Sequence, residues 1–173
     1  MNPKDGNESF QLAPMSPFIR LLTIFLLFLP PAFLIGGWLG DTVLLFVALF
    51  LAAIYAWVWF GFRPSQFVVR SDVIEVIWPF KRREIARNGI TEIRFMDSKT
   101  LYKEIGWGMR IGAGGLWGGF GWLWTQKRGI VQMYVSRTDS FVWIERGSNR
   151  PWLITPERPQ VFIQALQNRN ITE

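Results

Sequence analysis

Two long apolar blocks dominate the pattern of hydrophobic and polar positions in the N-terminal third of the chain. They cover residues 18–39 and 42–62, and only Gly40 and Asp41 interrupt them. A helix rises about 1.5 Å per residue and the hydrocarbon core of a bilayer is about 30 Å thick, so roughly 20 apolar residues span it. Each block therefore predicts a membrane-spanning helix, and residues 18–62 together predict a transmembrane helical hairpin.

The first block has two other interpretations. A cleaved secretory signal would need a small-residue cleavage site, and no such site follows the apolar run. A re-entrant hairpin that does not reach the far side of the membrane is the second alternative. Pro30 and Pro31 predict a kink in the middle of the block, because each proline removes a backbone donor and crowds the preceding turn.

The charges that flank the two blocks predict their orientation. Lys4 and Arg20 precede or begin the first block, cations follow the second block from Arg63 onward, and the connecting turn holds Asp41 without any Lys or Arg. The positive-inside rule then places both termini in the cytoplasm, as in a multi-pass protein of the inner (plasma) membrane. Residues 1–17 are polar and rich in proline, which predicts a disordered cytoplasmic tail.

After residue 63 the apolar positions recur in short runs that are typical of β-strands. The predicted strands cover residues 66–70, 73–78, 81–85, 90–96, 120–124, 129–137, 140–145 and 152–155. A short helical turn over residues 98–105, capped by Ser98, and a final helix from Pro159 to about Arg169 complete the pattern. The sequence therefore predicts an α+β membrane protein, in which residues 63–173 form a mainly antiparallel β barrel or sandwich with one C-terminal helix.

Composition narrows the chemistry of this chain. It contains no Cys and no His, which excludes disulfides, Cys/His zinc sites and a histidine general base. Its acidic residues are scattered beside cations, with no indication of a shared catalytic cleft. We therefore predict no catalytic residue, no cofactor and no metal, and a protein that is not an enzyme. A membrane tether also argues against a nucleic-acid partner.

Positive charge is concentrated outside the apolar blocks. From residue 63 onward there are 17 Lys and Arg against 10 Asp and Glu, a net charge of +7. The run Lys81-Arg82-Arg83, together with Arg63, is the candidate lipid-headgroup contact, since each cation near an anionic leaflet contributes about 1 kcal/mol. Ordinary solvated surface charge is the alternative interpretation of the same residues.

Residues 106–121 contain eight glycines among aromatic side chains. This Gly/Trp-rich segment has three interpretations: a core-forming hairpin, a loop that dips aromatic rings into the membrane interface, or a docking surface for a partner or an identical subunit. The candidate interface residues are Trp107, Trp117, Phe120, Trp122 and Trp124.

Three stretches carry a resemblance to a known family: the Gly/aromatic run 106–122, the strand 129–136, and the run 153–159 followed by Phe162 and Ile163. Together they resemble the bacterial PH-like membrane proteins, with two N-terminal transmembrane helices and a C-terminal PH-like domain. Arg158 departs from the pattern, which usually has an acid there. The resemblance implies a PH-like barrel at the membrane and offers no catalytic residue to transfer.

Two functions remain open at this stage. The first is a non-enzymatic, membrane-anchored PH-like domain that presents a basic, aromatic face to lipid headgroups or to a membrane protein partner. The second is a structural or scaffold subunit of a membrane complex or homo-oligomer, which docks through the Gly/Trp-rich segment.

Overall fold

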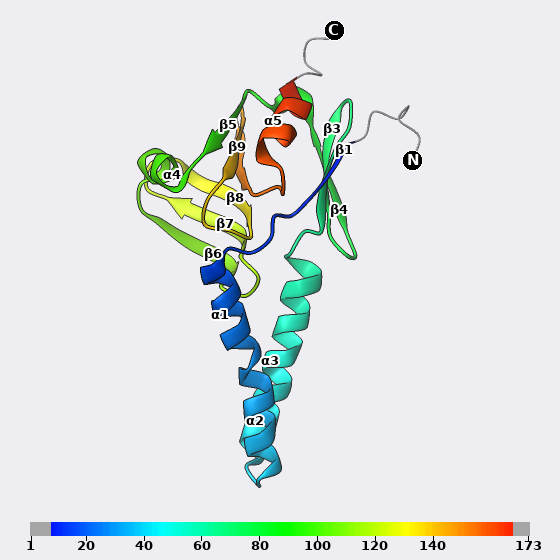
Figure 1. Cartoon of the computed structure of the whole chain (residues 1–173), viewed down its shortest axis with the longest axis vertical. Helices are drawn as coiled ribbons and strands as arrows, with labels where there is room; N and C mark the ends of the chain where they lie inside the picture. The colour runs from blue at the N-terminus through cyan, green and yellow to red at the C-terminus, as the bar shows by residue number, and fades with distance from the viewer. Residues whose placement is uncertain (1–7, 168–173) are drawn as a thin grey trace.

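A computed structural model of the protein describes residues 8–167. Figure 1 shows a helical hairpin that projects as a stalk from a β-rich domain. The hairpin consists of α1 (Pro17–Leu27) and α2 (Leu29–Trp38), which return through α3 (Thr42–Gly61). The continuous helical stretch Pro17–Trp38 and α3 are both long and apolar enough to cross a membrane, which indicates membrane association.

The predicted kink is confirmed between α1 and α2, where the helix is interrupted at Phe28. Pro30 has no N–H to donate to the carbonyl of Leu26, four residues earlier. The hydroxyl of Tyr55 on α3 donates a hydrogen bond to this carbonyl at 2.9 Å. The carbonyl that lacks its regular helical donor thus receives a hydrogen bond from the neighbouring helix, in addition to a backbone N–H at the end of α1.

The N-terminal segment is not the disordered tail that we predicted. Strand β1 (Glu8–Gln11) pairs antiparallel with β2 (Gln66–Val69), and Phe10, opposite Phe67, is buried. The Ser136 hydroxyl donates to the Ala13 carbonyl at 2.5 Å and fixes the chain that leads into α1. The helical hairpin is thus an insertion between two paired strands of one domain. Residues 1–7 lie outside the described part of the chain.

The strands form two sheets. The first has the order β1-β2-β3-β4, where β3 is Val73–Ile77 and β4 is Arg82–Ala86. The second has the order β5-β9-β10-β8-β7-β6, and its members are β5 (Glu92–Met96), β6 (Gly108–Gly114), β7 (Gly119–Thr125), β8 (Gly129–Val135), β9 (Phe141–Arg146) and β10 (Asn149–Ile154).

Neighbouring strands are antiparallel, except for the parallel pair of β10 and β8. The pairings among residues 8–167 leave two sheets rather than a closed ring. The predicted α+β class, the mainly antiparallel strands and the C-terminal helix α5 (Pro159–Gln167) are therefore confirmed, and barrel closure is not. A 3-10 turn, η2 (Arg87–Gly89), joins the two sheets along the chain.

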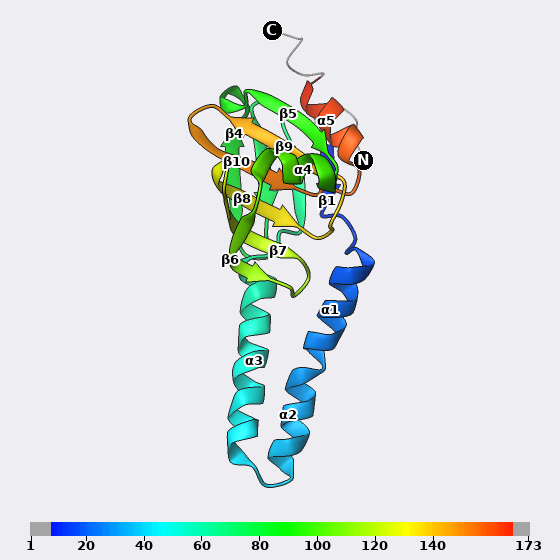
Figure 2. The same ribbon diagram turned by 90° about the vertical axis from the view of Figure 1, so that its left-hand side faces the viewer.

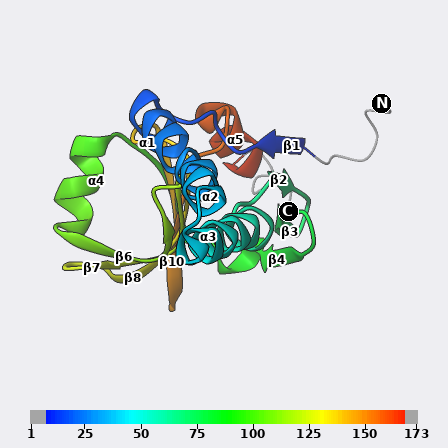
Figure 3. The same cartoon turned by 90° about the horizontal axis from the view of Figure 1, so that it is seen from below.

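The six-stranded sheet has packing partners on both faces. One face meets the four-stranded sheet and α5 in a core that includes Phe67, Trp152 and Phe162. The other face meets α4 (Ser98–Ile105), whose Leu101 belongs to a second core with Met133 of β8. Figure 3, viewed from below, shows α4 on one side of β6, β7 and β8, and the four-stranded sheet on the far side of the helical hairpin.

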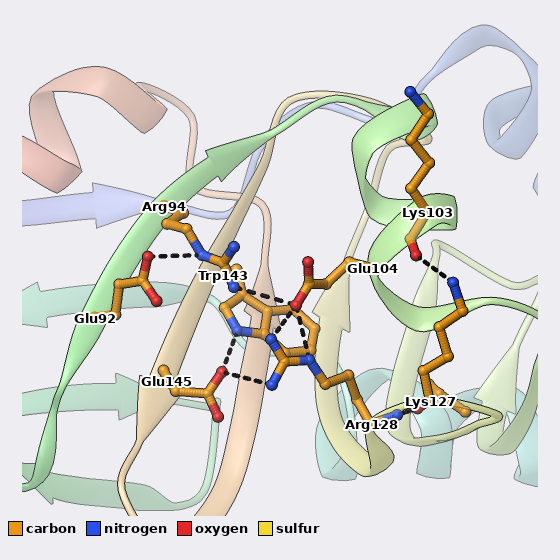
Figure 4. Close-up of polar contacts among 9 residues, drawn as sticks. Glu92, Arg94, Lys103, Glu104, Lys127, Arg128, Trp143 and Glu145 are labelled. Atoms are coloured by element: carbon orange, nitrogen blue, oxygen red, sulfur yellow. Dashed lines mark hydrogen bonds and ion pairs between the residues drawn. The ribbon is translucent and has the colours of Figure 1, made fainter.

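A network of charges holds the C-terminal end of α4 against the sheet (Figure 4). The Glu104 carboxylate accepts hydrogen bonds from Arg128 Nε at 2.7 Å and from Arg94 Nη2 at 3.3 Å. Glu145 extends the network, since its Oε2 accepts from Trp143 Nε1 at 2.8 Å. The hydrogen bond from Arg128 is the main cause that lowers the pKa of Glu104.

Candidate functional site

A groove of about 340 Å³ lies where the end of α3 meets the domain. Its wall comes from three places: the residues that end α3, the hairpin between β3 and β4, and one face of β7 and β8. We call it the basic groove, and it is lined by Gly61, Phe62, Trp78, Lys81, Arg82, Arg83, Gly121, Trp122, Gln132 and Tyr134.

The loop between β3 and β4 is fixed to the end of the helix. The Trp78 indole N–H donates to the Phe62 carbonyl at 2.9 Å, and the Trp78 amide donates to the Lys81 carbonyl at 2.8 Å. At the tip of the loop, Phe80 is 80% exposed, and its ring centroid lies 5.1 Å from that of Phe60 on α3. The loop therefore carries an exposed aromatic ring at the level of the last turn of the apolar helix.

The three cations of the run Lys81-Arg82-Arg83 differ in their surroundings. Arg82 lies 3.8 Å from Glu75, a buried carboxylate that also pairs with Arg70 at 2.9 Å. The Lys81 ammonium instead lies over the Trp78 ring at 4.8 Å. Lys81 and Arg83 have no acidic partner among residues 8–167. These two cations are therefore available to an anion, whereas Arg82 shares the carboxylate of Glu75 with Arg70.

A fourth cation, which the sequence did not indicate, strengthens the positive potential beside the groove. The guanidinium groups of Arg83 and Arg146 lie 5.7 and 5.3 Å from the ring of Trp152. Burial, and secondarily the charge of Arg83, lowers the pKa of Arg146. Neither guanidinium forms a salt bridge with a carboxylate of residues 8–167, and two like charges around one ring favour an anion nearby.

The inner wall of the groove supplies hydrogen-bonding groups. Burial raises the pKa of the Tyr134 hydroxyl, and the charge of Arg83 opposes this effect. The Gln132 side chain accepts from Trp122 Nε1 at 3.1 Å and donates to the Gly121 carbonyl at 3.0 Å. The described residues that line the groove include cations, aromatic rings and neutral polar groups and no carboxylate, so the groove can bind an anion beside an apolar surface.

Arg63, the fourth predicted headgroup contact, does not line the groove. Its guanidinium lies 4.4 Å from the ring of Trp59, and burial lowers its pKa. The Trp59 ring in turn meets Trp117 at 4.7 Å. The structure therefore brings Lys81, Arg82 and Arg83 together and places Arg63 in a separate stack between α3 and the turn from β6 to β7.

That turn enters the space between the two arms of the hairpin. The Trp117 amide donates to the hydroxyl of Thr23 on α1 at 2.9 Å, and the Thr23 hydroxyl also contacts the Gly115 carbonyl at 3.4 Å. A side chain at Gly115 would meet Leu22 of α1. Part of the Gly/Trp-rich segment thus connects the domain to the first helix, and Gly115 accommodates the turn through its positive φ of 93°.

The other candidate interface residues divide between core and surface. Phe120 is buried in the main core. Trp122 lines the basic groove, while Trp107 and Trp124 form an edge-to-face pair with centroids 6.1 Å apart and remain 59% and 42% exposed. Met109 on β6, opposite Trp124 in register, is also exposed. The outer surface of β6 and β7 therefore carries an exposed apolar patch next to the groove.

Comparison with known proteins agrees with this architecture. A family model described as a bacterial PH domain matches residues 65–170, more than half of the chain. No curated protein matches the chain, and no solved structure does. The matched residues contain every strand from β2 to β10, the whole of α4 and α5, and the loop that carries the basic run. The chain belongs to the bacterial PH domain family.

Proposed function

We propose that this protein is a membrane-anchored PH-like module whose basic groove binds the phosphate of anionic lipid headgroups. In this proposal the hairpin crosses the inner membrane and both termini are cytoplasmic, as the flanking charges predict. Binding rather than catalysis is the role that we assign, because the groove lining offers no acid to pair with a base.

The observation that carries the proposal is the position of two cations without acidic partners at the end of an apolar helix. Lys81 and Arg83 line the groove, and Phe80 between β3 and β4 lies beside Phe60 in the last turn of α3. Aromatic side chains concentrate at headgroup depth, and cations there attract anionic lipid. The groove would therefore open at the level at which lipid phosphates lie.

The test uses the full chain in detergent micelles that contain equal amounts of phosphatidylglycerol and phosphatidylcholine. Native mass spectrometry counts the lipids that each protein molecule retains. In the variant Lys81→Gln/Arg83→Gln, two contacts of about 1 kcal/mol each are removed, so we expect the preference for phosphatidylglycerol to fall by roughly 30-fold. Added salt should lower the same preference in the wild type.

The matched control is Lys103→Gln/Arg150→Gln, which removes the same charge at exposed positions outside the groove. We expect it to retain the lipid preference of the wild type. If both double variants lose the preference equally, net charge and not the groove attracts the lipid. If neither loses it, the headgroup proposal is wrong.

A second function is favoured by the exposed patch on β6 and β7. Trp107, Trp124 and Met109 form an apolar surface beside the edge strand β6, and aromatic side chains and Met are enriched at protein interfaces. In this alternative the protein is a scaffold subunit that docks through this surface. A photoreactive residue at position 124 should then give a crosslinked product in membranes that persists at high salt, whereas lipid attraction weakens.

A further inference from the structure

A second cavity lies on the opposite face of the six-stranded sheet. It has a volume of about 360 Å³, within the range of about 300–1,000 Å³ that is usual for small-molecule sites. Its walls are Leu101 and Ile105 of α4, Leu123 of β7, Met133 of β8 and Leu153 of β10. Because side chains alternate along a strand, this cavity and the basic groove are separated by the sheet itself.

The mouth of this cavity combines a contact with the membrane helix and a free positive charge. Ile19, in the first turns of α1, contributes to the lining, as do Arg110 of β6 and Arg137. Arg137 pairs with Asp139 at 2.7 Å, whereas Arg110 is exposed and has no acidic partner among residues 8–167. Figure 2 views this side of the molecule, with α4 in front of the sheet and α1 below.

The cavity is held open by contacts at both ends of α4. At the N-terminal end the Asp97 carboxylate accepts from the Thr100 amide at 2.8 Å, and the Ser98 hydroxyl donates to the Thr138 carbonyl. At the C-terminal end Glu104 is fixed by Arg128, as Figure 4 shows. A site preformed in this way avoids the ordering cost of binding, and its apolar lining lacks the contacts that a ligand would supply.

We propose that this cavity binds the hydrocarbon chain of an anionic amphiphile, with Arg110 as the contact for its charged head. Apolar walls alone would suit any hydrocarbon, but the free guanidinium at the mouth selects a chain that ends in an anion. The neighbouring start of α1 gives such a molecule a path from the bilayer surface. Free fatty acid and anionic phospholipid share this chemistry.

The test uses the full chain in phosphatidylcholine nanodiscs and a palmitic acid that carries a photoreactive diazirine near the end of its chain. Mass spectrometry of the digested protein locates the crosslinks. We expect them on the peptides that contain Leu101 and Met133, and we expect excess unlabelled palmitate to remove them. Crosslinks confined to the lipid-facing surface of the hairpin, and insensitive to palmitate, would overturn the proposal.

Two competition experiments then distinguish whether the bound hydrocarbon chain belongs to a free fatty acid or to a phospholipid. Palmitate and phosphatidylglycerol are compared as competitors of the same crosslink. Competition by palmitate alone assigns a free fatty acid, and competition by phosphatidylglycerol assigns a phospholipid chain. If methyl palmitate, which has no charge, competes as well as palmitate, the assigned role of Arg110 is wrong.

Variants test the wall and the mouth separately. Leu101→Trp fills the cavity, and we expect crosslinking to fall several-fold. Far-UV circular dichroism during thermal unfolding checks that the variant is folded. If it is not folded, palmitate competition in the wild type decides the proposal. Arg110→Gln should weaken palmitate competition several-fold and leave methyl palmitate unchanged, with Arg150→Gln as the exposed-arginine control. The double variant Lys81→Gln/Arg83→Gln should crosslink like the wild type, because the two sites are independent.

Discussion

Replacement of Phe10 by Ala tests whether the N-terminal strand is part of the domain. The Phe10 side chain is only 2% exposed, and its ring meets Phe162 of α5 edge-to-face at 5.1 Å. It also lies opposite Phe67 in the pairing of β1 with β2. Truncation of a buried phenylalanine to alanine costs about 3–5 kcal/mol, from lost burial and the cavity that remains.

The magnitude can be converted into a measurable shift in melting temperature. For a chain of this size each kcal/mol corresponds to about 2–4 °C, so Phe10→Ala should lower the Tm by roughly 6–20 °C. Thermal unfolding of the full chain in detergent micelles, followed by near-UV circular dichroism, reports the loss of aromatic packing. The control is Phe18→Ala, because Phe18 lies only eight residues later and is 68% exposed on α1.

Two results would refute this reasoning. If Phe10→Ala costs less than about 1 kcal/mol, β1 is a peripheral strand and its burial adds little. If Phe18→Ala destabilises the protein as much as Phe10→Ala, the exposed helix surface and not the domain core determines unfolding. The same logic predicts that a fragment of residues 63–173 is less stable than the full chain, since it lacks the strand that covers β2.

Two further predictions concern single hydrogen-bonded contacts. The hydrogen bond from Arg128 lowers the pKa of Glu104 in the folded protein. The ionised carboxylate therefore stabilises the folded state fully above the ordinary glutamate pKa, and this stabilisation is lost as pH falls through the lowered value. Glu104→Gln should flatten this acid dependence in urea unfolding measured between pH 5 and pH 3. Tyr55→Phe removes the donor to the Leu26 carbonyl and should lower stability by about 1 kcal/mol in micelles, whereas Tyr102→Phe, at an exposed position, should have no effect.

Periodicity was sufficient to predict most of the elements. The helix predicted over residues 98–105 has the same bounds as α4. Its cap was predicted one residue late, because Asp97 and not Ser98 accepts from the Thr100 amide. Aspartate and serine are both good capping residues, so their order along the chain cannot decide between them. The backbone conformation of Asp97, which is extended, decides it.

Strand β1 was not predicted, and β6 was predicted only as part of one interpretation of the Gly/Trp-rich segment, without strand bounds. Strand β1 has four residues and only one buried side chain, which is too short for an alternating pattern to be visible. Strand β6 is rich in glycine, which normally weakens a strand and indicates a turn. Here Gly112 pairs with Gly121 on β7, and a Cβ at Gly112 would lie 2.6 Å from the Phe120 carbonyl oxygen. These glycines permit a close approach between strands, in agreement with the core-forming hairpin that was one of three interpretations of the segment, whereas the register of the pairing could not be predicted.

The sequence indicated the cations of the basic run, but it did not indicate which of them would be paired with an acid and which would be available to an anion. Pairing of β3 with β4 brings Arg82 within reach of Glu75 and leaves Arg83 without an acid. Arg146 and Trp152 come from the hairpin of β9 and β10, more than 60 residues after the basic run. Strand register decides which cation of the basic run pairs with an acid and which lies beside Arg146, and no local motif encodes that register.

The insertion of the helical hairpin within the domain affects how tightly the groove would need to bind a lipid headgroup in the proposed function. The chain leaves β1 into α1 and returns from α3 into β2, so two covalent connections join helices and domain. The Trp78 indole bonds to Phe62 after α3, and the Trp117 amide bonds to Thr23 on α1. These contacts fix the position and orientation of the groove relative to the helical hairpin, whereas a flexible linker would let the domain move freely relative to the helices.

If the groove lies at the membrane surface, as we propose, it meets lipid headgroups at a high effective concentration. Binding then resembles an intramolecular step, and the entropy of association has largely been lost already through the anchor. Two free cations that contribute about 1 kcal/mol each would bind a soluble headgroup only weakly, yet they would suffice to bias which lipid occupies an adjacent position. In the proposed function, the groove would therefore select among lipids that already surround the protein, and the apolar hairpin would supply the affinity for the membrane.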